Sequence, residues 1–433
     1  MSGSDDPIVI VGAGHGGATL AALLRQAGHT GGVVLVGAEQ HHPYHRPPLS
    51  KKFTGAEVHQ PLRPAEFYPD NAIDLRRGVR VTEIDRAAMR VRLSDGTSAG
   101  YRALVLATGS VPRRLAVPGT DAAGLLTLRT LDDARTLGSA FGRGNPLAII
   151  GGGYVGMEVA AVASSAGIPV TVIEREDRVL ARVASSELSR RLSAAHHSRG
   201  TEIRTSAQVG AVYSVAGRVR GIELTDGTTV DAETVLVGIG ADPDDELAHR
   251  AGLACDNGVL VDEWGRTSDP SVFALGDVTR RPVPWAAGPV RLESIPNATE
   301  QARQVAAALL GTEHPEPEVP WFWSDQFDLK LKIAGLVSPG YRVVAREGRR
   351  PGAFALFHLN PENTVVAVET AGAPGEFIAG KKFVADRTQV DPDRLADPAA
   401  ALRDAVTESP AGNRQFTPRR IHASTSSAAH RTG

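Results

Sequence analysis

One stretch of the sequence decides the fold: Ile8-Val9-Ile10-Val11-Gly12-Ala13-Gly14-His15-Gly16-Gly17. Its four apolar residues predict a short buried strand, and the alanine- and leucine-rich segment after it predicts a helix through Ala27. The glycines between them follow the spacing G-x-G-x-x-G. This spacing permits a tight turn and brings a pyrophosphate close to the helix N-terminus, where free N–H groups favour an anion. A second strand, residues 33–36, leads to Glu39, which is placed to accept hydrogen bonds from a ribose.

The same unit occurs again at Leu147-Ala148-Ile149-Ile150-Gly151-Gly152-Gly153-Tyr154-Val155-Gly156. A helix and a strand at residues 170–173 follow, and the strand ends at Glu174. Two complete units indicate two bound dinucleotides. A carboxylate at Glu174 favours the free ribose 2′-hydroxyl of NAD(H) over the 2′-phosphate of NADP(H). Arg175 and Arg178 leave the alternative open, because a basic residue there holds a phosphate, although solvated loop charge is the preferred interpretation.

Two later segments suit the first unit. Residues 104–109 (LVLATG) read as a buried strand that ends in a turn of small residues, and residues 272–277 (VFALGD) read as another strand that ends in an acid. Ligands lie at the carboxyl ends of parallel strands, so Asp277 is placed to reach a polyol chain. A flavin has such a chain, its ribityl, and NAD does not, which favours a flavin at the first unit.

The order of these segments predicts an α/β protein with two Rossmann-like dinucleotide-binding domains and a smaller α+β C-terminal domain. The FAD-binding domain is expected to be discontinuous, at residues 1–112 and 241–315, with the NAD-binding domain inserted at 113–240. The C-terminal domain is expected at 316–408. Its strands are predicted near residues 331–336, 341–346, 353–358 and 364–368, with helical segments after them. Residues 409–433 are interpreted as a flexible tail.

Composition and charge exclude several classes of protein. The 433 residues include 47 basic and 49 acidic side chains, a formal net charge of −2, whereas a nucleic-acid-binding chain is expected to be strongly basic. Residues 1–12 are acidic where a secretory signal is basic, and no apolar run reaches the roughly 18–20 residues that span a bilayer. We therefore expect a cytoplasmic protein with neither a nucleic-acid nor a membrane partner.

The single cysteine, Cys255, excludes an intramolecular disulfide, an iron–sulfur cluster held by four cysteines and the usual cysteine-type zinc site. Redox chemistry must then use a bound organic cofactor, and Cys255 is interpreted as a packed or half-exposed loop residue. Three histidines within residues 41–45 lie in a proline-broken loop without a second ligand cluster, so no metal site is predicted. His15, His196 and His197 are interpreted as packing or surface residues.

Four motifs make the sequence resemble a known family. They are residues 44–51 (YHRPPLSK), 151–161 (GGGYVGMEVAA), 293–302 (ESIPNATEQA) and 320–328 (PWFWSDQFD). Together they resemble the two-dinucleotide flavoproteins that include the glutathione-reductase-like enzymes. More narrowly, they are similar to the NADH:ferredoxin reductases of bacterial oxygenase systems, such as putidaredoxin, rhodocoxin and rubredoxin reductases. The resemblance covers residues 7 to about 400.

The resemblance implies residues for both binding sites, position by position. Those toward FAD are Gly12, Gly14, Gly16, Glu39, Arg46, Lys51, Val81, Ala107, Arg129, Asp277, Ile295 and Trp323. Those toward NAD are Gly151, Gly153, Tyr154, Gly156, Glu158, Glu174 and Gly240. The family often carries an acid at both positions after Gly37, whereas this chain has Ala38 and then Glu39.

Lys51 and Glu158 are interpreted as the catalytic residues, a charged pair near the flavin N5 in which the lysine stabilises the reduced anionic flavin. The structural alternative for Glu158 is an acid on a helix surface. Tyr154 is expected to gate or support the nicotinamide position. Alternation along an extended segment puts Trp321 and Trp323 on one face. One is a candidate to close over the flavin and form part of the route to the acceptor; the alternative, an aromatic domain interface, is preferred for at least one of them.

The resemblance implies an FAD-dependent NAD(P)H:ferredoxin oxidoreductase that takes a hydride from NADH and passes single electrons to a 2Fe–2S ferredoxin or a rubredoxin supplying an oxygenase. Disulfide reductases and cysteine-dependent NADH oxidases of this fold carry their reactive cysteines in the stretch that corresponds to residues 41–48. This sequence has no cysteine there, which argues against both activities. Two alternatives remain, a flavin NADH oxidase or diaphorase and an NADH-sensing redox switch resembling apoptosis-inducing factor. Lys330 and Lys332 are candidate contacts for an acidic ferredoxin, and a monomer or weak dimer is expected.

Overall fold

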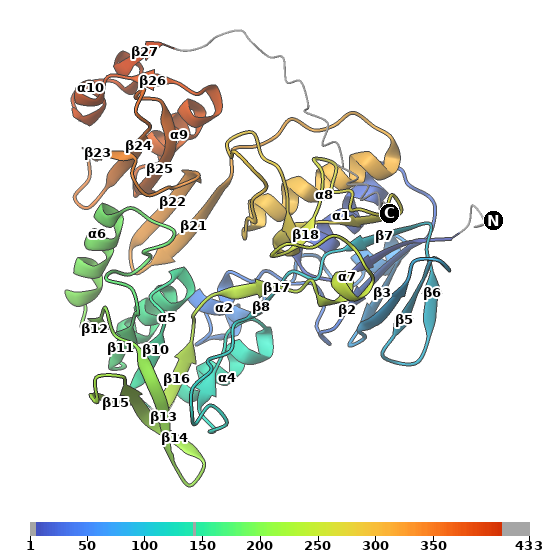
Figure 1. The fold of residues 1–433 in the computed structure, drawn as a ribbon, viewed down its shortest axis with the longest axis horizontal. Helices are drawn as coiled ribbons and strands as arrows, with labels where there is room; N and C mark the ends of the chain where they lie inside the picture. The colour runs from blue at the N-terminus through green and yellow to red at the C-terminus, as the bar shows by residue number, and fades with distance from the viewer. Residues whose placement is uncertain (1–5, 142–143, 409–433) are drawn as a thin grey trace, which may run out of the picture.

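The computed structural model describes residues 6–141 and 144–408; the predicted tail at residues 409–433 lies outside the described residues. Three sheets, each with its own helices, form three parts (Figure 1). The first sheet lies to the right in this view, the second at the lower left and the C-terminal sheet at the upper left. This arrangement confirms the predicted fold class.

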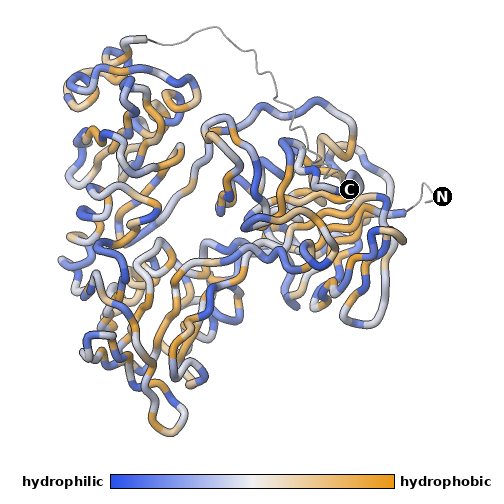
Figure 2. The backbone as a smooth tube through the Cα atoms, viewed as in Figure 1, coloured by the Kyte–Doolittle hydropathy of each residue, from blue (hydrophilic) through white to orange (hydrophobic). Residues whose placement is uncertain are grey.

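The first sheet is parallel and has the order β19-β7-β1-β2-β3. Its central strands are wholly apolar and buried, as expected for a parallel sheet covered on both faces (Figure 2). The strands are β1 (Ile8–Val11), β2 (Val33–Gly37), β3 (Ile73–Arg77), β7 (Ala103–Leu106) and β19 (Val272–Ala274).

Helices and a small antiparallel sheet cover the two faces of the first sheet. On one face α1 and α8 pack against each other and against the apolar side chains of β1 and β7. The other face packs against the sheet β4-β5-β6. These elements are α1 (His15–Gln26), α8 (Ile295–Leu310), β4 (Val81–Asp85), β5 (Arg90–Leu93) and β6 (Ser98–Gly100). Shorter elements of this part are α2 (Pro48–Lys51), α3 (Phe67–Asp70), α7 (Glu246–Arg250), β18 (Val259–Leu260) and β20 (Thr279–Arg280).

The second sheet repeats the first, with the parallel order β12-β11-β10-β16-β9. Its strands are β9 (Leu125–Leu126), β10 (Leu147–Ile150), β11 (Val170–Ile173), β12 (Thr201–Arg204) and β16 (Thr234–Val237). Its helices are α4 (Leu131–Phe141), α5 (Tyr154–Ser165) and α6 (Ser186–His197). An antiparallel sheet adjoins it, formed by β13 (Val209–Val215), β14 (Arg218–Leu224) and β15 (Thr229–Asp231).

Two short antiparallel strands, β8 (Ser110–Pro112) and β17 (Ala241–Pro243), pair where the chain passes between the first two parts. The chain enters the second part after β8 and returns from it into β17, so the pair fixes both crossings at one point. The predicted boundaries at residues 112/113 and 240/241 fall at this pair, and the division into domains stays a prediction.

The C-terminal sheet is antiparallel, with the order β21-β22-β25-β24-β23. Its strands are β21 (Trp321–Gln326), β22 (Leu329–Gly335), β23 (Arg342–Glu347), β24 (Phe354–Leu359) and β25 (Val365–Ala371). Helix α9 (Pro374–Asp386) packs on it, and α10 (Pro392–Ala396), β26 (Gln389–Val390) and β27 (Val406–Glu408) complete this part. The predicted set of strands lacked β21, although its residues were expected to be extended.

The three parts share one apolar core beneath α5. Leu49 of the first part, Met157 of the second and Ile333 of the third belong to one cluster of buried side chains. This shared core fixes the three parts relative to one another, which a site between them requires. Within residues 6–141 and 144–408, no helix is long and apolar enough to cross a membrane.

Candidate functional site

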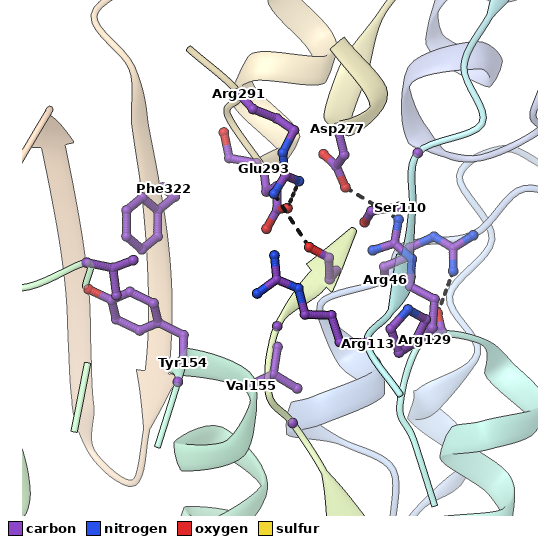
Figure 3. A pocket seen from close by; sticks show the side chains of 18 of the residues that line it. Arg46, Ser110, Arg113, Arg129, Tyr154, Val155, Asp277, Arg291, Glu293 and Phe322 are labelled. Carbon is purple, nitrogen blue, oxygen red and sulfur yellow. Dashed lines mark hydrogen bonds and ion pairs between the residues drawn. The ribbon is translucent and has the colours of Figure 1, made fainter. Parts of the chain in front are cut away.

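A cavity of about 1640 Å³ lies where the three parts meet. Both glycine loops, the N-terminal end of α8 and the first half of β21 contribute to its lining. Figure 3 shows Tyr154 and Phe322 on one side of it, Arg46, Arg129 and Asp277 on the other, and Arg113, Arg291 and Glu293 between them. Ligand cavities commonly measure roughly 300–1,000 Å³, so this one has room for more than one ligand.

The first glycine loop has the shape that a pyrophosphate requires. Gly12 has a φ of +113°, and a Cβ there would lie 2.1 Å from the Ala107 carbonyl oxygen, so the turn needs glycine. Gly14, which caps α1, has no atom within 4 Å of the place of a Cβ, leaving the helix N-terminus open to the cavity. Gly16 and Ala107 line the cavity beside it. These residues fit the diphosphate of FAD at a helix N-terminus.

A series of hydrogen bonds and ion pairs connects Glu39, which follows β2, to Asp277. Glu39 accepts hydrogen bonds from Arg46 at 2.9 Å and from the Tyr44 hydroxyl at 2.5 Å. Arg46 also donates to the backbone carbonyl of Arg129 at 2.5 Å, and Arg129 pairs with Asp277 at 3.4 Å. Burial lowers the pKa of the Arg129 guanidinium and the charge of Arg46 lowers it further, whereas Asp277 acts in the opposite direction. All five side chains line the cavity.

Lys51 and Glu158, 107 positions apart in the sequence, form an ion pair of 2.7 Å between Nζ and Oε1. The Lys51 side chain is 16% exposed and that of Glu158 is 5% exposed, and both line the cavity. Lys51 is the last residue of α2 and Glu158 lies in the second turn of α5. Two hydroxyls also donate to Glu158, Ser50 Oγ at 2.5 Å and Ser324 Oγ at 2.6 Å. Glu158 is therefore a buried carboxylate with three donors and not an acid on a helix surface.

The second glycine loop repeats the geometry of the first. Gly151 has a φ of +105°, and a Cβ there would lie 2.4 Å from the Gly238 carbonyl oxygen. At Gly153, the cap of α5, the nearest atom would be 4.0 Å away, so this helix N-terminus is also open. Gly156 packs against Gly151 and does not line the cavity. Gly240, also predicted to bind NAD, does line it.

The acid of the second unit is held by backbone amides. Glu174 accepts hydrogen bonds from the N–H of Gly152 at 2.6 Å and of Glu176 at 2.9 Å. Arg178 was predicted to be solvated, but it is half-buried and donates to the carbonyls of Ala181 and Ala184 and to Ser189 Oγ. The prediction was wrong because neighbouring loop carbonyls need a donor. Arg178 is thus occupied in holding the loop and does not line the cavity.

Aromatic side chains form the wall beside the second loop. Tyr154 meets Phe322 edge to face at 5.0 Å between ring centroids. The Tyr154 hydroxyl is buried without a hydrogen-bond partner among the described residues. Burial raises the pKa of this hydroxyl well above its usual value, and the carboxylates of Glu369 and Glu158 add to the effect. Trp321 and Trp323 share one face of β21, with 5.8 Å between their rings, and both line the cavity, as does Ile295.

Among the predicted FAD residues, Val81 alone does not line the cavity. Its side chain packs against the core below the first sheet, and its neighbour Arg80 lines the cavity instead. The sequence interpretation also missed residues that the structure brings to the cavity. They are Ser50, Arg113, Arg182 and Arg291. A single serine or arginine carries no periodic signal, so only the contact reveals it.

Of the residues considered for other chemistry, Cys255 lies outside the cavity, whereas His15, His41 and His42 line it. Cys255 is half-buried, and burial raises the pKa of its thiol to about 11. His41 contacts Asp132 at 3.1 Å. In the described part of the chain, no three histidine, cysteine, aspartate or glutamate side chains gather as a metal site would require.

Comparisons with known proteins agree with this geometry. Residues 6–302 match the pyridine nucleotide-disulphide oxidoreductase family, and residues 321–406 match a reductase C-terminal domain. The chain is 45% identical over 399 residues to a probable ferredoxin reductase, CtmF, of Castellaniella defragrans, covering 91% of this chain and 97% of the relative. It is 40% identical over 402 residues to rhodocoxin reductase of Rhodococcus erythropolis, covering 92% and 94%. A crystal structure of the covalent putidaredoxin reductase–putidaredoxin complex superimposes with a TM-score of 0.88 at 40% identity, covering 93% of this chain and 98% of that one.

Proposed function

The chain belongs to the pyridine nucleotide-disulphide oxidoreductase family, and we propose that it moves electrons from NADH through bound FAD to a 2Fe–2S ferredoxin or rubredoxin. That acceptor would supply an oxygenase in the cytoplasm. The observation that carries the proposal is the meeting of two open glycine loops and the Lys51–Glu158 pair in one cavity. Relatives named as ferredoxin reductases, matched over nine-tenths of the chain or more, support the same acceptor.

FAD, when bound, supplies the exchange between a two-electron hydride donor and a one-electron acceptor. In this proposal the predicted FAD residues would hold its parts. Gly14 leaves room for the diphosphate beside Gly12 and Gly16, Glu39 and Arg46 would bind the adenosine end, and Asp277 would bind the ribityl chain.

The second unit orients NADH. Gly153 leaves the N-terminus of α5 open to the diphosphate, and Glu174 is held by two amides in a position to accept hydrogen bonds from the adenosine ribose. Tyr154 and Phe322 form an aromatic wall where the nicotinamide would lie. The Lys51 ammonium, fixed by Glu158, places a positive charge where negative charge develops during hydride transfer.

Glu174→Ala is expected to raise the KM for NADH about 10-fold and to reduce the preference for NADH over NADPH. The reason is that a charged acceptor for the ribose hydroxyls is lost, together with the repulsion of a 2′-phosphate. The measurement is the steady-state rate of ferricyanide reduction with each nucleotide. Glu223→Ala, at an exposed position of β14, is the control. An unchanged KM for both nucleotides would contradict the assignment of Glu174.

The decisive experiment for the proposed function is NADH-driven reduction of cytochrome c with and without an added 2Fe–2S ferredoxin. Strong stimulation by ferredoxin is expected, and stimulation that falls as salt increases would support an electrostatically steered complex. Rapid flavin reduction without stimulation by several ferredoxins would indicate an oxidase or diaphorase. Slow reduction with a long-lived nucleotide complex would indicate a redox switch.

The two lysines predicted to meet an acidic ferredoxin differ in their surroundings. Lys330 is exposed and pairs with Asp325 at 3.2 Å, and Lys332 lies 5.3 Å from the centroid of the Phe377 ring. Asp325 partly neutralises Lys330, so Lys332 is the better candidate for contact with an acidic partner.

A further inference from the structure

Behind Glu158, on the side away from the cavity, three polar side chains form a chain of hydrogen bonds. Ser324 Oγ lies 2.6 Å from Glu158 Oε1, Gln326 Nε2 lies 3.2 Å from Ser324 Oγ, and His196 Nε2 lies 2.9 Å from Gln326 Oε1. Ser324 and Gln326 lie on β21 of the C-terminal part, and His196 lies near the end of α6. All three are 0% exposed, and Gln326 and His196 do not line the cavity.

The chemistry of each group fixes the direction of the chain. Glu158, ionised beside Lys51, only accepts, so the single hydroxyl hydrogen of Ser324 points to it. Ser324 Oγ must then accept from the amide NH₂ of Gln326, which turns the amide oxygen toward His196. His196 must donate from Nε2, and its Nδ1 is left as an unprotonated nitrogen. Among the described residues Nδ1 has no hydrogen-bond partner, which agrees with this tautomer, because a proton on Nδ1 would leave a buried N–H without an acceptor.

Apolar side chains would pack the contact between α6 and β21 at lower cost, because buried polar groups must all be satisfied. Phe327, which meets the His196 ring edge to face at 4.8 Å, shows that apolar packing is possible there. The chain is also a poor path for protons, since the amide of Gln326 would have to exchange its tautomer to pass one. Its remaining effect is to orient the carboxylate that fixes Lys51.

We propose that Ser324, Gln326 and His196 are positioning residues for the Lys51–Glu158 pair, through which the C-terminal part sets the geometry of hydride transfer. The inference rests on the proposed function only in requiring that NADH reduces a flavin bound in this cavity. The ferredoxin half of the reaction is not involved.

The first test examines the direction of these hydrogen bonds without enzyme turnover. The FAD-containing protein is labelled with ¹⁵N-histidine, and the ring nitrogen shifts of His196 are assigned by comparison with His196→Asn. A neutral ring protonated on Nε2 is expected at pH 7, because burial lowers the pKa of His196 to about 4. A ring protonated on Nδ1, or a charged ring, would overturn the proposal, and no electron acceptor enters this result.

The second test separates positioning from binding. In anaerobic stopped-flow reduction by NADH, Ser324→Ala is expected to lower the limiting rate constant about 10-fold and to leave the NADH dissociation constant within 2-fold. Ser165→Ala is the control, because Ser165 lies on the same helix as Glu158 and donates only to the Ala161 carbonyl. Equal limiting rates for Ser324→Ala and the native protein would overturn the proposal.

A double variant shows whether the residues act as one unit. Gln326→Met alone is expected to slow reduction less than Ser324→Ala does, and to add nothing when combined with it, because its effect passes through Ser324. Additive losses in rate would mean that Gln326 acts through the fold. They would overturn the proposal that Ser324 and Gln326 act as one hydrogen-bonded unit. Since no ferredoxin is present, a protein that shows these effects and reduces no ferredoxin would contradict the proposed function alone.

Discussion

Lys51→Met is expected to slow the reduction of bound flavin by NADH about 100-fold, a loss of about 2.7 kcal/mol of transition-state stabilisation. The methionine keeps most of the alkyl chain that packs between α2 and α5 and removes only the charge. Glu158 then keeps two serine donors and loses its counter-ion. A buried carboxylate without a cation opposes negative charge arriving nearby, so the variant loses an attraction and gains a repulsion.

The measurement is the decay of flavin absorbance after anaerobic mixing with NADH, taken over a range of NADH concentrations. Lys52→Met is the matched control, because Lys52 is the next residue, is 47% exposed and pairs with Glu57 on the surface. Its charge lies outside the cavity, so its limiting rate should equal that of the native protein. A Lys51→Met rate within 3-fold of the native rate would remove Lys51 from the mechanism.

Local sequence signals were sufficient for both dinucleotide units. The strands at residues 8–11 and 147–150 and the glycines after them were predicted from a strand–glycine loop–helix pattern within about 30 residues, and the structure confirms those elements. The pairing of Lys51 with Glu158 came from the resemblance of their motifs, because nothing local joins positions 107 apart.

Other features depend on contacts that no local pattern reveals. Ser324 and Gln326 occur in a strand whose aromatic residues dominate its pattern, and their role appears only when β21 lies against α5 and α6. Arg178 looks like loop charge until the carbonyls around it are seen. Polar residues that are satisfied by distant partners are therefore the ones that sequence interpretation misses in this chain.

The contact between the second and C-terminal parts has its own buried carboxylate, Glu369, which is 0% exposed on β25. It accepts hydrogen bonds from the backbone N–H of Ser185 at 3.0 Å and from the Ser185 hydroxyl, and it lies 3.0 Å from His358 Nε2. Ser185 is also the N-cap of α6, where its hydroxyl oxygen accepts from the N–H of Leu188. One carboxylate thus joins β24, β25 and the start of α6.

Glu369→Leu is expected to lower the free energy of unfolding by about 3–5 kcal/mol, because removing one member of a buried charged group leaves its partners unsatisfied. Ser185 would lose the acceptor for both its N–H and its hydroxyl, and His358 would lose its only hydrogen-bond partner among the described side chains. The measurement is urea denaturation followed by far-ultraviolet circular dichroism. Glu362→Leu, in the exposed turn between β24 and β25, is the control. A stability within 1 kcal/mol of the native protein would mean that leucine packing replaces the network, and that this carboxylate does not hold the two parts together.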